Sequence, residues 1–178
     1  MKQVRFHGRG GQGAVTAADV LAMAVFKDGK YSQAFPAFGV ERRGAPVQAF
    51  ARISDKFVRD RSQIYEPDYV VVLDPTLIEI AGVTEGLSKQ GKLVINSEKE
   101  HAIDGFDTYF VDATQIAIDN LGVPIVNTAM LGAFAGATKE VTFESLKEAL
   151  MERFGERLGP KNCKAAEIAY KEVKKFEE

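Results

Sequence analysis

The sequence has 178 residues, of which 46% are hydrophobic and 27% charged, and its formal net charge is -2. This length predicts a single domain over residues 1–178 with its own core, and the balanced charge gives no overall attraction to nucleic acid. The one cysteine, Cys163, excludes an internal disulfide, a zinc site of paired cysteines and an iron–sulfur cluster, which takes several thiolates.

The sequence has no segment typical of a targeting signal or a membrane span. Its N-terminus lacks the hydrophobic run of a signal peptide. The longer hydrophobic stretches, Ala14–Phe26 and Asn127–Thr138, fall short of the ~20 residues that cross a bilayer. We therefore expect a soluble, cytoplasmic protein that binds neither membranes nor nucleic acid.

Strand-like and helical segments alternate along the first half of the chain. Periodicity and turn residues predict, in order, a strand at Gln3–His7, a glycine-rich turn at Gly8–Gly13, a helix at about Gln12–Lys27 ending at Asp28-Gly29, a strand at Tyr31–Phe35, a loop at Ala37–Ala45, and strands at Pro46–Ile53 and Tyr69–Leu73.

The rest of the chain adds two more strands, and its last third is predicted to be helical. It contains, in order, a short helix after Asp74-Pro75-Thr76, strands at Lys92–Ile95 and Thr108–Val111, and helices at Thr114–Leu121, Asn127–Ala137, Thr142–Phe154 and about Lys161–Phe176.

The pattern as a whole predicts an α/β fold. Tyr69–Leu73 is hydrophobic at every position, which is typical of a parallel strand covered on both faces. We predict a Rossmann-like, doubly wound domain with a mainly parallel central sheet.

The first candidate site is the glycine turn, defined as residues 8–13, which matches the pattern GxGxxG between a strand and a helix. Glycines let a phosphate approach the backbone, and the helix start offers free N–H groups to an anion. A tight turn without a ligand is the alternative. NAD binding is disfavoured, because no acidic residue stands at the end of the second strand. The predicted contacts are Gly8, Arg9, Gly10, Gly11, Gln12 and Gly13.

The second candidate site is the arginine loop, defined as residues 36–46, which is bounded by prolines. Arg42 and Arg43 can hold a phosphate or carboxylate, with Glu41 orienting one guanidinium. A solvated loop with a structural Glu–Arg pair is the alternative.

Other polar residues are predicted to have structural roles. Asp74 and Asp112 follow strands at the side where α/β sheets bind ligands, but both are also placed to cap helices, which is the preferred role. Thr76 is the alternative cap of the short helix after Asp74. His7 could donate to a phosphate, but it is expected to pack or hydrogen-bond at its strand end. Cys163 is expected to be a structural or incidental thiol.

The combination of motifs resembles one family. The glycine turn, Ala34-Phe35-Pro36, the run Glu41–Val47, Asp74 and Asn127–Gly132 together resemble the gamma subunit of 2-oxoacid:ferredoxin oxidoreductases, most closely the pyruvate synthase type. Related 2-oxoglutarate and indolepyruvate enzymes tend to have an Arg-Gly-Gly sequence where this chain has Arg43-Gly44-Ala45-Pro46. That departure points to pyruvate or a branched 2-oxoacid, such as 2-oxoisovalerate.

The resemblance implies a division of labour among subunits. Such enzymes decarboxylate a 2-oxoacid on thiamine diphosphate, pass two electrons through iron–sulfur clusters to ferredoxin, and transfer the acyl group to coenzyme A. Thiamine diphosphate, magnesium and [4Fe-4S] clusters would reside on alpha, beta and delta partner subunits. This gamma-type chain would hold no cofactor, metal or catalytic residue, and would be inactive alone.

What the chain itself would contribute is help in binding coenzyme A at a shared site, together with subunit assembly. The glycine turn, with Arg9 and Gln12, and the loop residues Glu41, Arg42 and Arg43 are the expected contacts. Contact with partner subunits alone is an equal alternative. Two further alternatives for the whole chain are a stand-alone nucleotide-binding enzyme and a scaffold subunit without a ligand.

Overall fold

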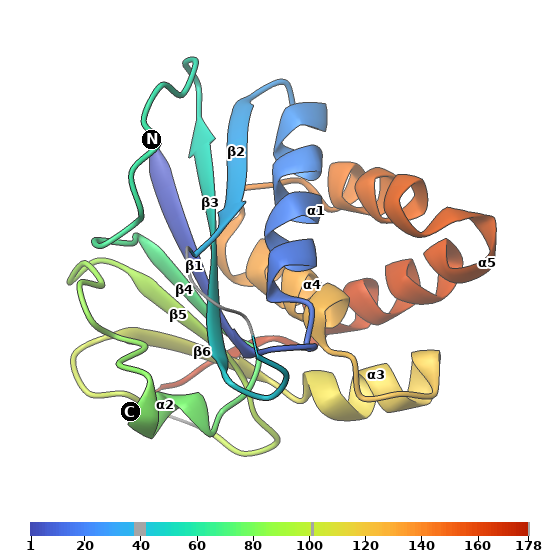
Figure 1. The fold of residues 1–178 in the computed structure, drawn as a ribbon. Coiled ribbons are helices and arrows are strands. Elements are labelled where there is room, and N and C mark those ends of the chain that lie inside the picture. The colour runs from blue at the N-terminus through green and yellow to red at the C-terminus, as the bar shows by residue number, and fades with distance from the viewer. Residues whose placement is uncertain (38–41, 101, 178) are drawn as a thin grey trace.

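The computed structural model describes residues 1–37, 42–100 and 102–177, which form one seven-stranded sheet and the helices packed on it (Figure 1). The strand order is β2-β3-β1-β4-β5-β6-β7. The strands are β1 (Lys2–Arg9), β2 (Tyr31–Pro36), β3 (Pro46–Ser54), β4 (Tyr69–Val72), β5 (Lys92–Asn96), β6 (Asp107–Val111) and β7 (Lys174–Lys175).

The centre of the sheet is parallel. β1, β4, β5 and β6 pair in parallel, whereas β3 is antiparallel to β1 and to β2, and β7 is antiparallel to β6. The predicted α/β fold with a mainly parallel central sheet is confirmed. One feature departs from a simple Rossmann arrangement, because β3 lies between β1 and β2 and separates the end of β2 from the turn after β1.

The longer helices cover one face of the sheet (Figure 1). There β1, β3 and β4 present small and branched hydrophobic side chains, which form the main core with the helices. α4 (Asn127–Thr138) packs closely on α5 (Phe143–Glu172), because a Cβ at Gly132 would overlap the carbonyl oxygen of Ala166. The helices are α1 (Ala14–Lys27), α2 (Leu77–Ile80), α3 (Ala113–Leu121), α4 (Asn127–Thr138) and α5 (Phe143–Glu172), with α2 on the opposite face.

The opposite face carries a thinner layer. Over β4 and β5 a small hydrophobic cluster packs under α2, which has only four residues, and the loops around it. Over β1 and β3 the buried side chains are Phe50 and three polar residues. Arg5 and His7 point away from the helices, and Arg52 is fully buried. The second layer of the predicted doubly wound fold is therefore built largely from loops.

The C-terminal region corrects two details of the sequence prediction. The last helix ends at Glu172 and does not reach Phe176, because the chain leaves it to form β7 and the backbone N–H of Phe176 donates to Thr108 O at 2.8 Å. The two predicted final helices adjoin directly, broken only at Gly155, whose φ of 69° turns the backbone. No helix among the described residues is both long and hydrophobic enough to cross a membrane.

Candidate functional site

The two candidate loops, predicted separately from sequence, lie against each other at the carboxyl ends of the parallel strands. The backbone N–H of Gly10 donates to Ala45 O at 2.9 Å, and that of Gly44 donates to Gly10 O at 3.0 Å. Gly10 and Arg43 form an isolated parallel bridge. The glycine turn and the described part of the arginine loop therefore form one surface.

Packing explains two glycines of the motif. A Cβ at Gly10 would overlap the carbonyl oxygen of Arg42, so glycine at this position lets the arginine loop approach. Gly13 has a φ of 79°, and a Cβ there would lie 2.5 Å from Asn127 Nδ2, which donates to Gly13 O. The glycine turn thus contacts both the arginine loop, through Gly10, and the start of α4, through Gly13. It also leaves the start of α1 accessible.

Asp74 lies at the centre of a hydrogen-bond network behind the glycine turn. Its Oδ2 accepts from Arg9 Nε at 3.1 Å and from Gln12 Nε2 at 3.0 Å. Its Oδ1 accepts from the Thr76 backbone N–H at 3.0 Å and from Thr76 Oγ1 at 2.6 Å. Gln12 Oε1 in turn accepts from the backbone N–H of Arg9 at 2.7 Å.

The guanidinium of Arg9 extends this network to the arginine loop. Besides Asp74 it donates to Gly44 O at 3.0 Å and to Thr76 Oγ1 at 2.8 Å. Burial alone would raise the pKa of the Asp74 carboxyl, but hydrogen bonds from Thr76 and Gln12 and the charge of Arg9 lower that pKa below its usual value. Asp74 is therefore ionised at neutral pH.

Of the two candidate cap residues of α2, Asp74 and Thr76, the structure places Thr76 at the N-cap and gives Asp74 another role. The N-cap residue of α2 is Thr76, which makes no side-chain cap hydrogen bond, and Asp74 instead closes the turn before that helix. Asp112 does cap α3, as predicted, since its Oδ1 accepts from the backbone N–H of Gln115 at 2.9 Å. Asp74 differs because its second oxygen, Oδ2, accepts hydrogen bonds from two side chains of the glycine turn, Arg9 and Gln12.

A hollow of about 220 Å³ adjoins the glycine turn. Its lining includes Gly11, Gly13 and the first turn of α1 up to Thr16. α1 begins without a side-chain cap and without an acidic residue in its first turn. Since the first N–H groups of a helix have no partner within it, this end of α1 is open to an acceptor.

The arginine loop places two cations at this surface. Arg42 and Arg43 are both exposed, and neither forms an ion pair with a residue that the structure describes. The predicted contact Glu41 lies outside the described residues. Arg9, by contrast, is already engaged with Asp74, Thr76 and Gly44, and Gln12 with Asp74 and the Arg9 backbone.

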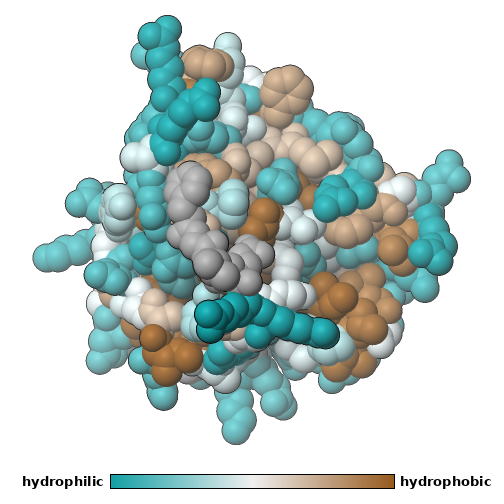
Figure 2. Space-filling model, viewed as in Figure 1, coloured by the Kyte–Doolittle hydropathy of each residue, from teal (hydrophilic) through white to brown (hydrophobic). Residues whose placement is uncertain are grey.

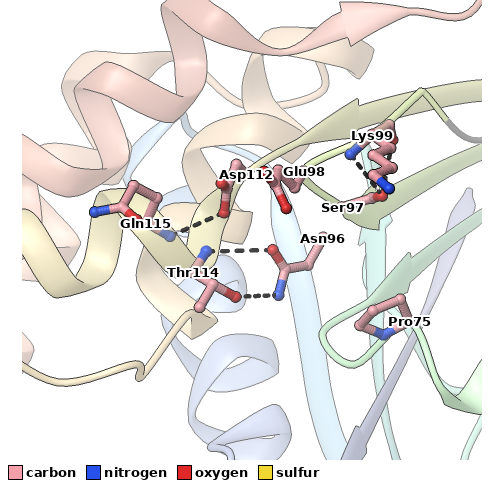
Figure 3. A pocket seen from close by; sticks show the side chains of 8 residues that line it. All are labelled: Pro75, Asn96, Ser97, Glu98, Lys99, Asp112, Thr114 and Gln115. Carbon is pink, nitrogen blue, oxygen red and sulfur yellow. Dashed lines mark hydrogen bonds between the residues drawn. The ribbon is translucent and has the colours of Figure 1, made fainter.

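A second hollow, of about 560 Å³, lies farther along the same edge, between the ends of β5 and β6 (Figure 3). Asn96 crosses it, and its Nδ2 donates to Leu73 O and to Thr114 Oγ1, each at 3.0 Å. Asn96 Oδ1 accepts from the backbone N–H of Thr114 at 3.3 Å. These bonds tie the ends of β4 and β5 to the start of α3, so Asn96 and Thr114 serve the fold.

His7 points into the polar layer on the other face of the sheet. It is 1% exposed, and its Nε2 accepts from Arg5 Nε at 2.9 Å. Burial and, secondly, the charge of Arg5 lower the pKa of His7 to about 3. Because neutral His7 accepts at Nε2 in this bond, its role is structural.

Sequence reasoning missed the buried arginines. Arg5 donates to the carbonyl oxygens of Val83 and Glu85, and Arg52 donates to Ser62 O at 2.6 Å and to Gln33 Oε1 at 2.8 Å. A charged residue inside a hydrophobic strand was the available signal. Cys163 is buried, and burial raises the pKa of its thiol, which suits the structural or incidental thiol expected from sequence.

Comparison with known proteins identifies the family. Residues 3–172 match the family model described as pyruvate ferredoxin/flavodoxin oxidoreductase. The chain belongs to this family. It is 62% identical over 175 residues to pyruvate synthase subunit PorC of Methanocaldococcus jannaschii, an alignment that covers 98% of each chain.

Two further comparisons agree with this assignment. The common subunit gamma of the pyruvate/ketoisovalerate oxidoreductases of Thermococcus kodakarensis is 55% identical over 184 residues, covering 99% of this chain and 100% of that protein. The crystal structure of pyruvate oxidoreductase subunit PORC from Thermotoga maritima is 38% identical, with a TM-score of 0.87 over 99% of this chain and 98% of that one. The chain is therefore of the gamma-subunit type, as its motifs predict.

The single cysteine of the sequence and the described residues do not fit an iron–sulfur cluster. The sequence offers one cysteine, and the described residues bring no three His, Cys, Asp or Glu side chains together as metal ligands. A [4Fe-4S] cluster needs about four thiolates, which one chain of this composition cannot supply.

Proposed function

We propose that this chain is the gamma subunit of a complex that converts pyruvate and coenzyme A to acetyl-coenzyme A and CO2, with two electrons passed to ferredoxin. Alpha, beta and delta subunits would hold thiamine diphosphate, magnesium and the [4Fe-4S] clusters. The family membership and the end-to-end similarity to pyruvate synthase subunits support this assignment.

The chain's own contribution is to bind coenzyme A at a site shared with its partners. The observation that carries this proposal is the joining of the glycine turn to the arginine loop through Gly10, Gly44 and Ala45. It places the open start of α1 and the two exposed cations on one surface. Coenzyme A carries a pyrophosphate and a 3′-phosphate, which suit backbone N–H groups and arginines.

In this assignment the backbone of the glycine turn faces one phosphate group. Arg42 and Arg43 face the other, with Glu41 beside them in sequence. The side chains of Arg9 and Gln12 lie one layer behind, on Asp74.

A second substrate, 2-oxoisovalerate, fits the chain equally well. The relative from T. kodakarensis is named as a subunit common to pyruvate and ketoisovalerate oxidoreductases. A gamma subunit shared in this way leaves the choice of 2-oxoacid to other subunits, so the same coenzyme A surface serves either reaction.

A hydrophobic patch beside the site suits subunit assembly. Ile118, Val123 and Ile125 are 44%, 43% and 47% exposed, on α3 and on the segment that leads into α4. Figure 2 shows hydrophobic residues gathered at the lower right, where Figure 1 places this part of the chain. Asn127, at the start of α4, donates to Gly13 O, so the segment that carries Val123 and Ile125 leads to the glycine turn.

The stand-alone NAD-binding alternative is less well supported. In a dinucleotide site an acidic residue at the end of the strand next to β1 binds the ribose. Here β3 occupies that place, and β2, which lies beyond it, ends in Ala34, Phe35 and Pro36.

The double variant R42A/R43A in the assembled enzyme tests the coenzyme A contact. We expect the complex to form and the KM for coenzyme A to rise at least about tenfold, since each arginine supplies a charge-assisted contact. The matched control is R59A/R61A, which removes two exposed arginines from the loop after β3, at the opposite edge of the sheet.

The outcomes separate the alternatives. Loss of assembly with R42A/R43A, and with it of activity, would assign the loop to a subunit interface. Normal assembly with an unchanged KM for coenzyme A would contradict both roles.

A further inference from the structure

We infer that Asp74 is a positioning residue for the coenzyme A surface, acting on the arginine loop through Arg9. This inference rests on the proposed function of that surface and adds a residue which touches no ligand. It also gives the side chains of Arg9 and Gln12 a role other than contact with coenzyme A, since their polar atoms form hydrogen bonds with other residues of this chain.

The first step is the link from Asp74 to the glycine turn. Asp74 follows β4, which is the neighbour of β1 in the sheet, so its carboxylate lies behind the turn. A single oxygen, Oδ2, accepts from both Arg9 and Gln12, at 3.1 and 3.0 Å. Asp74 is only 15% exposed in its side chain, which limits the competition of water for these bonds.

The second step is the link from the glycine turn to the arginine loop. With its Nε held by Asp74, the Arg9 guanidinium donates Nη1 to Gly44 O, directly after Arg43. Thr76 fixes the other end of the guanidinium through Nη2 and is itself fixed by Asp74 Oδ1. The planar guanidinium thus has three partners, and its orientation sets where Gly44 lies.

The third step is the consequence for the ligand surface. Arg42 and Arg43 are exposed side chains, and the bonds that locate their backbone run through Gly10, Gly44 and Ala45. If the Arg9 bond to Gly44 is lost, one anchor of this segment is lost while the pairing of β1 with β3 stays intact. The binding of coenzyme A should then weaken more than the folding or the chemical step does.

The variant D74N tests this role against the matched control D112N. An amide at position 74 replaces one carboxylate oxygen by an NH₂ donor, yet both oxygens of Asp74 already accept from donors. At position 112 one oxygen accepts from Gln115, so Asn keeps that cap. Both residues end parallel strands at the same edge, but Asp112 belongs to no part of the coenzyme A surface.

Two readouts are measured on the assembled enzyme. We expect D74N to raise the KM for coenzyme A about fivefold or more, with kcat within about twofold of the unmodified enzyme. We also expect trypsin to cleave faster after Arg42 and Arg43, because the segment has lost one anchor. Mass spectrometry of the peptides measures this cleavage. D112N should change neither readout by more than about twofold.

R9K serves as the second variant if D74N does not assemble. A lysine ammonium keeps the ion pair with Asp74 but cannot reach Gly44 O and Thr76 Oγ1 together, so R9K should shift both readouts as D74N does. Unchanged KM and unchanged cleavage in the variant that assembles would overturn the inference, as would an equal effect of D112N.

The two proposals fail in different ways. If R42A/R43A leaves the KM for coenzyme A unchanged, the proposed function fails whatever Asp74 does. If R42A/R43A raises the KM but D74N and R9K do not, only the positioning role fails.

Discussion

The buried pair of Arg5 and His7 predicts how the stability of this chain depends on pH. His7 has a pKa of about 3 in the folded chain, compared with about 6.5 when exposed, because burial and the Arg5 charge disfavour the imidazolium. The folded state therefore binds no proton at His7 between pH 6.5 and 3, whereas the unfolded chain does. The contribution of neutral His7 to the unfolding free energy is fully present above pH 6.5 and is lost as the pH falls from 6.5 toward 3.

The magnitude follows from the linkage relation. Each pH unit below the unfolded pKa costs about 1.4 kcal/mol of unfolding free energy, so about 2 kcal/mol is lost between pH 7 and pH 5. Carboxyl groups with lowered pKa values, such as Asp74, titrate below this window. Burial raises the pKa of Asp19, which favours the folded state as the pH falls and so cannot cause the loss. The loss between pH 7 and pH 5 is thus assigned mainly to His7.

Urea unfolding of the purified chain at pH 7 and pH 5 measures this loss. The variant H7Q places an amide oxygen near the position of Nε2, where it can accept from Arg5 without titrating. We expect H7Q to reduce the loss by about 2 kcal/mol. The same loss in H7Q as in the unmodified chain would refute the assignment.

Two glycine substitutions test the close contacts that shape the fold and the site. G132A should lower the unfolding free energy by about 3 kcal/mol, because its Cβ would overlap Ala166 O where α4 packs on α5; an unchanged thermal midpoint would contradict this contact. G10A should cost about 2 kcal/mol and speed tryptic cleavage after Arg42 and Arg43, because its Cβ would overlap Arg42 O; equal cleavage rates would show that the loops do not meet as described.

Hydrophobic patterning was sufficient to predict the elements that form the main core. The uniformly hydrophobic β4 and the small-residue helix α4 stand where periodicity predicts them. The end of α1 at Asp28 and the start of α5 at Thr142 also follow from local signals, since both are cap residues. Local sequence fixes such features because the interactions lie within one turn of the chain.

Features that depend on strand order could not be predicted. The glycine turn meets the arginine loop because β3 pairs antiparallel with β1, and no local pattern reveals that pairing. Asp74 reads as a helix cap in sequence, but the neighbouring strand places Arg9 and Gln12 against it. Likewise, Arg52 is buried because a loop after β3 folds back over it and supplies Ser62 O as an acceptor.

The central claim is that coenzyme A contacts the surface formed by the glycine turn and the arginine loop. Hydrogen–deuterium exchange of the assembled enzyme, with and without coenzyme A, tests it most directly. The account predicts slower exchange on binding in peptides covering residues 10–17 and 42–47, with no change over residues 55–66 at the opposite edge. Unchanged exchange in both of the first two segments, with protection elsewhere in the complex, would contradict it.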